Sequence, residues 1–154
     1  MNTRQDILIF YEGLNLCRNI TGVEYDPEFT YSLSINIREL KNEYESIVSA
    51  VESRKKDFEA EKKAFAEENC ERDELGNCII ENGIYKFAPE KQKLVNEKIL
   101  ELETKYKKEL SENKEFLKGE SKVEIYKVKN SDFPKMNPRI ADMLFLMREP
   151  KEKE

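Results

Sequence analysis

The longest regular pattern of apolar residues in the chain lies between residues 27 and 69. One register repeats every seven residues, and a second register accompanies it over the first half. The first register consists of Thr30, Ile37, Tyr44, Val51, Phe58 and Phe65. The second consists of Leu33, Leu40 and Ile47. Such a heptad predicts one helix with a packing seam. Asp26 can cap it and Pro27 can open it, so we expect a helix from Pro27 to about Asn69, roughly 60 Å long.

The second register turns polar at Arg54 and Glu61, while the first register keeps Phe58 and Phe65. The second half of the helix therefore carries only a sparse aromatic stripe. Two interpretations stay open. The stripe is buried against neighbouring helices, or Phe58 and Phe65 form a self-association face with a second copy of the chain.

Three further helices are expected from capping residues and apolar spacing. The first runs from Arg4 to Ile20, with Thr3 and Asp6 in a capping box and Gly22 beyond its end. The next runs from Pro89 to about Leu117 and stops at Gly119. A short last helix begins at Asn137-Pro138.

A β-hairpin is predicted between the two longest helices. Asn82-Gly83 separates two apolar runs, residues 78–81 and 84–87. Asn-Gly is the preferred pair for a type I′ turn, which needs positive φ at both central residues. Residues 73–77 form an approach turn, and residues 122–128 read as a later strand.

These elements predict an α+β fold that is mostly α. Its centre is a long antiparallel helical hairpin with an inserted β-hairpin. A small base combines the N-terminal helix, the late strand and the C-terminal helix. We expect one elongated domain over residues 1–148 and a flexible tail over residues 149–154.

Composition supports a soluble cytoplasmic protein. Hydrophobic and charged residues each make up 38 % of the chain, and the net charge is −5. No stretch approaches the ~20 apolar residues that span a bilayer, and the N-terminus shows no signal peptide. Three cysteines with irregular spacing do not form a disulfide framework, which favours a reducing compartment.

Catalytic chemistry is hard to build from these residues. The chain has no histidine, so histidine-dependent nucleophilic sites and the usual zinc sites are excluded. The glycines are scattered singly and form no phosphate loop. Cys70 and Cys78 with one acidic ligand would make only a poor metal clamp. We therefore expect no metal, no cofactor and no enzymatic activity.

Two surfaces are candidates for binding. The hairpin is too apolar for a bare ribbon, so it must be either core or a contact surface for a protein partner. Its apolar residues are Ile79, Ile80, Ile84, Tyr85 and Phe87. The alternative is a basic segment with interleaved aromatic residues that could hold nucleic acid, although acidic residues dilute it. Its cations are Lys122, Lys127, Lys129, Lys135 and Arg139.

The order of the motifs adds one indication. A helix precedes the Asp73–Phe87 segment, which contains Asp-Glu-Leu-Gly and Asn-Gly-Ile-Tyr; a charged helix, the Val123–Val128 run and Asp132-Phe133-Pro134 follow. This order resembles a family of uncharacterised small proteins of bacteriophages and prophages, over roughly residues 32–147. The resemblance implies a phage origin and a non-enzymatic role, either against host or defence machinery or in virion assembly. It carries over no catalytic residue.

Overall fold

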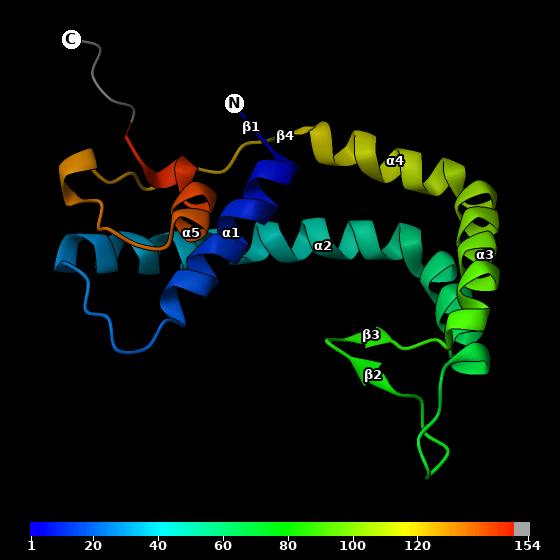
Figure 1. Cartoon of the computed structure of the whole chain (residues 1–154). Coiled ribbons are helices and arrows are strands. Elements are labelled where there is room, and N and C mark those ends of the chain that lie inside the picture. The colour runs from blue at the N-terminus through cyan, green and yellow to red at the C-terminus, as the bar shows by residue number, and fades with distance from the viewer. Residues whose placement is uncertain (150–154) are drawn as a thin grey trace. The chain divides into compact units, whose positions relative to one another are not determined.

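The computed structural model describes residues 1–149 and is a mostly helical α+β fold, as expected (Figure 1). The chain divides into two compact units where the pattern predicted one domain over residues 1–148. Unit 1 comprises residues 1–50 together with residues 115 onward, and unit 2 comprises Val51–Lys114. Most of the expected tail, residues 150–154, lies outside the described residues. No described helix combines the length and the apolar character that crossing a membrane requires.

Unit 1 is built on two helices whose ends follow from local capping. Helix α1 (Arg4–Arg18) begins with the expected capping box between Thr3 and Asp6. Helix α2 (Pro27–Asn69) has the predicted bounds, and its first part belongs to this unit. At its start, the Asp26 carboxylate accepts a hydrogen bond from the Glu28 amide at 3.0 Å. Their apolar faces meet in one core, which also takes in three residues from the later chain. The core is Phe10, Tyr11, Leu14, Cys17, Phe29, Leu33, Ile37, Leu40, Val128, Leu144 and Met147.

The C-terminal part of unit 1 packs closely on α1. Asn137 caps α5 (Pro138–Met143) by accepting a hydrogen bond from the Arg139 amide, and the 3-10 turn η3 (Phe145–Met147) follows. At the crossing, a Cβ atom added to Gly13 would lie only 2.6 Å from Cβ of Met143. Glycine is therefore required there by the short distance between the two helices.

The expected strand over residues 122–128 is wrong. The paired strands of unit 1 are instead β1 (Asn2–Thr3) and β4 (Glu120–Ser121), which are antiparallel, and Val128 forms only an isolated bridge with Arg148. Within residues 1–149, no strand pairs with the residues between Ser121 and Val128. At Tyr126 the buried side chain of Asn36 supplies the hydrogen bonds that a neighbouring strand would make. Its amide donates to the Tyr126 carbonyl and its oxygen accepts from the Tyr126 amide, both at 2.8 Å.

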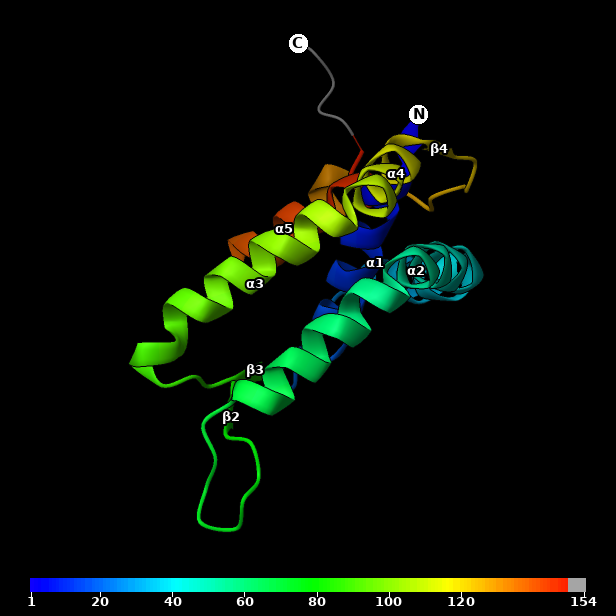
Figure 2. The same cartoon turned by 90° about the vertical axis from the view of Figure 1, so that its right-hand side faces the viewer.

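Unit 2 contains the second half of α2, the hairpin strands β2 (Ile80–Glu81) and β3 (Ile84–Tyr85), a 3-10 turn η1 (Pro89–Lys91), α3 (Gln92–Lys105) and most of α4 (Lys107–Lys118). Helix α3 lies antiparallel beside the end of α2 (Figure 2). Contacts between the helices confirm the direction. Phe58 packs edge-on against Tyr106, and the buried Asn113 side chain donates to the Val51 carbonyl at 3.1 Å.

One continuous helix from Pro89 to Leu117 was expected, and this is also wrong. The helix breaks at Tyr106, whose φ and ψ are −103° and 19°. The tyrosine ring lies against Phe58, and its hydroxyl donates to the Glu61 carboxylate at 2.7 Å. The break therefore occurs where two contacts with α2 hold the tyrosine, a constraint that apolar spacing along the helix does not reveal.

Replacing Asn36 by alanine should destabilise unit 1 by about 2–4 kcal/mol, because two hydrogen bonds are lost and the Tyr126 backbone groups are left in a partly buried place. Asn36 is only 1 % exposed. Asn42→Ala on the exposed face of the same helix is the matched control and should change the free energy of unfolding by less than about 0.5 kcal/mol. Denaturant unfolding of both variants measures the difference. Equal stabilities would show that Asn36 does not hold this segment.

Candidate binding groove

The β-hairpin has the geometry that its turn sequence predicts. Asn82 and Gly83 have φ values of 52° and 76°, which fits a type I′ turn. The strands pair Ile80 with Tyr85 and Glu81 with Ile84. Because paired residues share a face of the ribbon, Ile80 and Tyr85 lie on one face, and Glu81 and Ile84 lie on the other.

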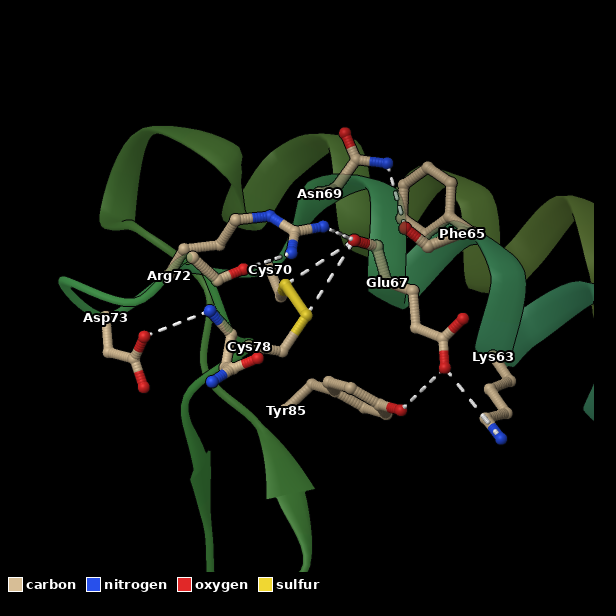
Figure 3. The surroundings of a disulfide bond; sticks show 11 residues. Lys63, Phe65, Glu67, Asn69, Cys70, Arg72, Asp73, Cys78 and Tyr85 are labelled. Carbon is tan, nitrogen blue, oxygen red and sulfur yellow. Dashed lines mark hydrogen bonds and ion pairs between the residues drawn. A yellow bond between two sulfur atoms is a disulfide. The ribbon is translucent and has the colours of Figure 1, made fainter.

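The root of the hairpin is fastened to the end of α2 by a disulfide between Cys70 and Cys78 (Figure 3). Arg72 forms a second link between the same two segments. Its guanidinium donates to the Glu67 carbonyl at 2.6 Å and to the Gly76 carbonyl at 2.7 Å, which joins the last turn of α2 to the approach turn. Asp73 closes that turn by accepting hydrogen bonds from the Leu75 and Asn77 amides.

The disulfide corrects the interpretation of the cysteines. Both sulfurs of the suggested metal clamp are bonded to each other, so neither is a thiolate ligand. Cys17, in contrast, is buried in the core of unit 1, and burial raises the pKa of its thiol. A buried thiol with a raised pKa is a poor nucleophile. No group of three potential metal ligands occurs within residues 1–149.

The hairpin, α2 and α3 enclose a groove in unit 2 with a volume of about 740 Å³. We call it the hairpin groove. Its lining is mainly apolar, with charged side chains from one helix. The residues are Glu59, Lys62, Lys63, Phe65 and Ala66 from α2, Gly83, Ile84, Tyr85 and Phe87 from the hairpin region, and Gln92, Val95 and Ile99 from α3. The structure thus brings together Ile84, Tyr85 and Phe87, three of the hairpin residues proposed from sequence.

The hairpin residues differ in exposure. Ile84 is 70 % exposed and Ile80 is 54 % exposed, whereas Ile79, Tyr85 and Phe87 are partly buried. The Tyr85 hydroxyl donates to Glu67, and Lys63 forms an ion pair with the same carboxylate (Figure 3). Tyr85 therefore helps to hold the hairpin on α2, while Ile80 and Ile84 make few contacts within the unit.

The two phenylalanines proposed for self-association lie in different environments. Phe58 is buried, only 8 % exposed, beneath Tyr106. Phe65 is partly buried and lines the hairpin groove, with the Lys98 ammonium 6.0 Å from its ring centroid. The premise of two exposed rings on one helical face is therefore wrong, and self-association through Phe58 and Phe65 stays a prediction.

A charged cluster holds α2 and α3 together beside the groove. Lys105 forms an ion pair with Glu61, and the Tyr106 hydroxyl donates to the same carboxylate. The hydrogen bonds from Lys105 and Tyr106 lower the pKa of Glu61 below its ordinary value, and the bond to Glu61 raises the pKa of Lys105. All three groups are solvent-accessible, so the cluster adds orientation more than stability.

The residues of the alternative nucleic-acid surface are in unit 1, and all are exposed. They are Lys122, Lys127, Lys129, Lys135 and Arg139. Lys122 and Lys127 precede Val128, and Lys129 precedes η2 (Asn130–Asp132). Lys135 follows η2, and Arg139 is in the first turn of α5. Lys127 also lines a groove of this unit.

Sequence reasoning missed the helical side of the hairpin groove and the disulfide. Lys62, Lys63 and Ala66 line the groove from α2, and Val95 and Ile99 line it from α3. These two sets form one groove only because the two helices pack side by side, which the sequence pattern of either helix does not show. The disulfide had a local signal. Cys70 and Cys78 are separated by eight positions with a tight turn between them, a spacing that can bring the two Cα atoms within disulfide range.

Comparison with known proteins adds no relative: no family model, curated protein or solved structure matches this chain.

Replacing Cys70 and Cys78 together by serine should destabilise the hairpin region by about 2–3 kcal/mol, the loop-closure entropy of a cross-link this short. Amide hydrogen exchange at Ile79 and Lys86 measures the effect, because the Lys86 amide donates to the Ile79 carbonyl across the hairpin root. A reductant should weaken the wild-type protein similarly and leave the double variant unchanged. Thiol titration of the unfolded, unreduced chain should detect Cys17 alone; three reactive thiols would contradict the cross-link.

The Glu61 cluster predicts a pH dependence. Since the pKa of Glu61 is lowered from its ordinary 4.5, its contribution to stability is fully present above pH 4.5 and is lost as the pH falls through the lowered value. The stability difference between wild type and Glu61→Gln should therefore shrink in acid. Unfolding of both proteins between neutral and acidic pH tests this. A difference that grows in acid would contradict the sign.

Proposed function

We propose that this chain is a non-enzymatic protein-binding protein whose partner docks in the hairpin groove. The observation that carries the proposal is the apolar wall of the groove. Ile84 is exposed on this wall, although it belongs to a hairpin that is fastened to α2. Exposed apolar groups around a preformed groove are characteristic of interaction sites.

Other exposed apolar residues of unit 2 support a macromolecular partner over a small ligand. Large apolar side chains are exposed on the second face of the hairpin and on α3, beyond the groove itself. They are Ile80, Leu94 and Leu100. A small ligand inside the groove would leave all of them in water.

The dimensions of the groove favour an amphipathic helix from the partner. Its walls cover residues 59–66 of α2 and 92–99 of α3, each about two helical turns or ~10 Å. A partner helix would offer anchors at positions i, i+3 or i+4 and i+7 over that length. Lys62 and Lys63 on one wall would then meet polar residues flanking the anchors.

The phage setting and the cytoplasm are parts of the same proposal, and they rest on the motif order and the composition. In that setting the protein is an accessory or inhibitor that engages host or defence machinery, or a component of virion assembly. The Cys70–Cys78 disulfide bears on the compartment, because stable disulfides belong to oxidising environments and cytoplasmic ones are usually transient. The redox state of Cys70 and Cys78 in cells would distinguish an oxidising compartment from the cytoplasm.

Nucleic-acid binding is the second candidate, supported by the exposure of all five proposed cations. It predicts a steep loss of affinity with salt, because phosphate binding releases counterions. A protein complex held by the apolar groove should tolerate salt.

Ile84→Asp should weaken the complex by about 2 kcal/mol or more, since a charge would enter the apolar interface, while stability changes by less than about 0.5 kcal/mol. Ile84 suits this test better than Tyr85, which also bonds to Glu67. Leu75→Asp is the matched control, being 87 % exposed and outside the groove.

The partner is first identified by affinity purification from the native source with the wild-type chain. Calorimetry with the purified partner then compares wild type and both variants. If Leu75→Asp abolishes binding and Ile84→Asp does not, the partner docks elsewhere.

A further inference from the structure

The segment from Lys122 to Lys127 follows β4 and is paired with no strand of the described residues. From Ser121 to Tyr126 its residues alternate between buried or partly buried and exposed, the two-residue period of an extended chain. Val123 and Ile125 pack against the core of unit 1. Yet the only backbone groups of Lys122–Lys127 with a hydrogen-bond partner inside residues 1–149 are those of Tyr126, which bond to Asn36.

The hydrogen-bonding direction of each residue follows from its neighbours. Ser121 pairs with Asn2, and the Arg4 amide donates to the Gly119 carbonyl at 2.9 Å. Hydrogen-bonded pairs alternate along an antiparallel ladder, so Ser121 directs its backbone groups toward β1. Tyr126 directs its own toward α2. The two residues are five positions apart, and backbone groups an odd number of positions apart point to opposite edges of an extended chain, so both constraints fit one extended segment.

The same alternation places the free groups. The backbone amides and carbonyls of Val123 and Ile125 point to the edge that β1 occupies at Ser121, and those of Lys127, beyond the alternating stretch, have no hydrogen-bond partner within residues 1–149 either. A groove of about 430 Å³ lies at these three residues. We call it the edge groove. Its other lining residues are Asn2, Phe145, Leu146 and Arg148.

The edge groove has a distinct chemistry. Phe145 and Leu146 give it an apolar side. Lys127 and Arg148 are its charged residues, and neither forms an ion pair with a carboxylate in the described chain. The Arg148 guanidinium is held in place, because it donates to the Asn130 side chain at 2.8 Å and lies over the Phe133 ring.

We propose that Lys122–Lys127 is a docking edge for an extended segment of a partner protein, in which apolar and acidic residues alternate. The segment adds as a strand in line with β1. Its main chain pairs with Val123, Ile125 and Lys127, its apolar side chains contact Phe145 and Leu146, and its carboxylates lie near Lys127 and Arg148. Strand addition of this kind takes affinity from main-chain hydrogen bonds and selectivity from alternate side chains.

The probe is a short, capped synthetic peptide of alternating valine and glutamate, titrated into the full chain and followed by backbone amide NMR. The amides of Val123, Ile125 and Lys127 should shift and gain protection from hydrogen exchange. The same peptide with alternate backbone nitrogens methylated, on the edge that faces the protein, keeps its side chains and loses its donors. It should bind at least tenfold more weakly.

Variants of the chain test the same edge. Lys127→Pro removes one free amide and should weaken the peptide at least tenfold. Glu124→Pro is the matched control, because this exposed residue directs its amide toward α2, and it should change affinity by less than twofold. Lys127→Gln keeps the amide and should cost only a few-fold. If Lys127→Pro fails to fold, the methylated peptide still decides the result with the wild-type chain.

Three results would overturn the proposal. The methylated and unmethylated peptides bind equally well, or the peptide causes no shift. A single-stranded oligothymidylate binds these residues with steep salt dependence while the peptide does not, which would make the segment a nucleic-acid surface. The amides become protected without peptide as protein concentration rises, which would make the edge an interface between two copies. Because Ile84→Asp leaves this edge intact, its result is independent of the hairpin groove.

Discussion

Helix α2 is the element on which both units depend, because one helix of 43 residues supplies a wall to each. A helix this long cannot bury its apolar stripe against a single neighbour, so the neighbour changes along it. In unit 1, α1 covers Leu33, Ile37 and Leu40. In unit 2, Tyr106 covers Phe58, and Phe65 is left to the hairpin groove. The second apolar register is lost after Ile47, and the hairpin groove lies farther along the helix, from Glu59 onward.

Hydrogen bonds from polar side chains link separate segments of this chain. Asn36 bonds to both backbone groups of Tyr126, Asn113 bonds to the Val51 carbonyl, and Arg72 bonds to two carbonyls around the hairpin root. Asn36 satisfies two backbone groups that no strand pairs with among the described residues, whereas Asn113 adds a second hydrogen bond to a carbonyl inside α2. Since each contact depends on a single side chain, one substitution at such a site removes the whole contact and should lower the free energy of unfolding.

Local chemistry explains which parts of the structure could be read from sequence. The ends of α2 were predicted correctly because Asp26 and Pro27 act on the adjacent backbone, and the hairpin turn because Asn82 and Gly83 tolerate positive φ. The strand at residues 122–128 and the unbroken helix through Tyr106 were wrong for the opposite reason. Strand pairing and the Tyr106–Glu61 bond depend on partners tens of residues away.

The candidate site shows the same division. Ile84, Tyr85 and Phe87 could be singled out because a short ribbon with so much apolar surface needs support. The helical wall of the groove could not, since it needs the pairing of α2 with α3. The disulfide, with its short spacing, was the one long-lived contact within reach of sequence reasoning, and an odd number of cysteines concealed it.

The way in which the hairpin is held sharpens the case that its exposed residues serve contact. The Cys70–Cys78 bond, Arg72, the Asp73 turn and the Tyr85–Glu67 bond all act at the root or on the inner side. None of them uses Ile80 or Ile84. Asn82 and Gly83 set the register of the strands without them as well. Apolar groups that are exposed on a ribbon fastened in this way, and that its own stability does not require, lose little conformational freedom on binding. That is the property that makes a small apolar surface an effective anchor for a second protein.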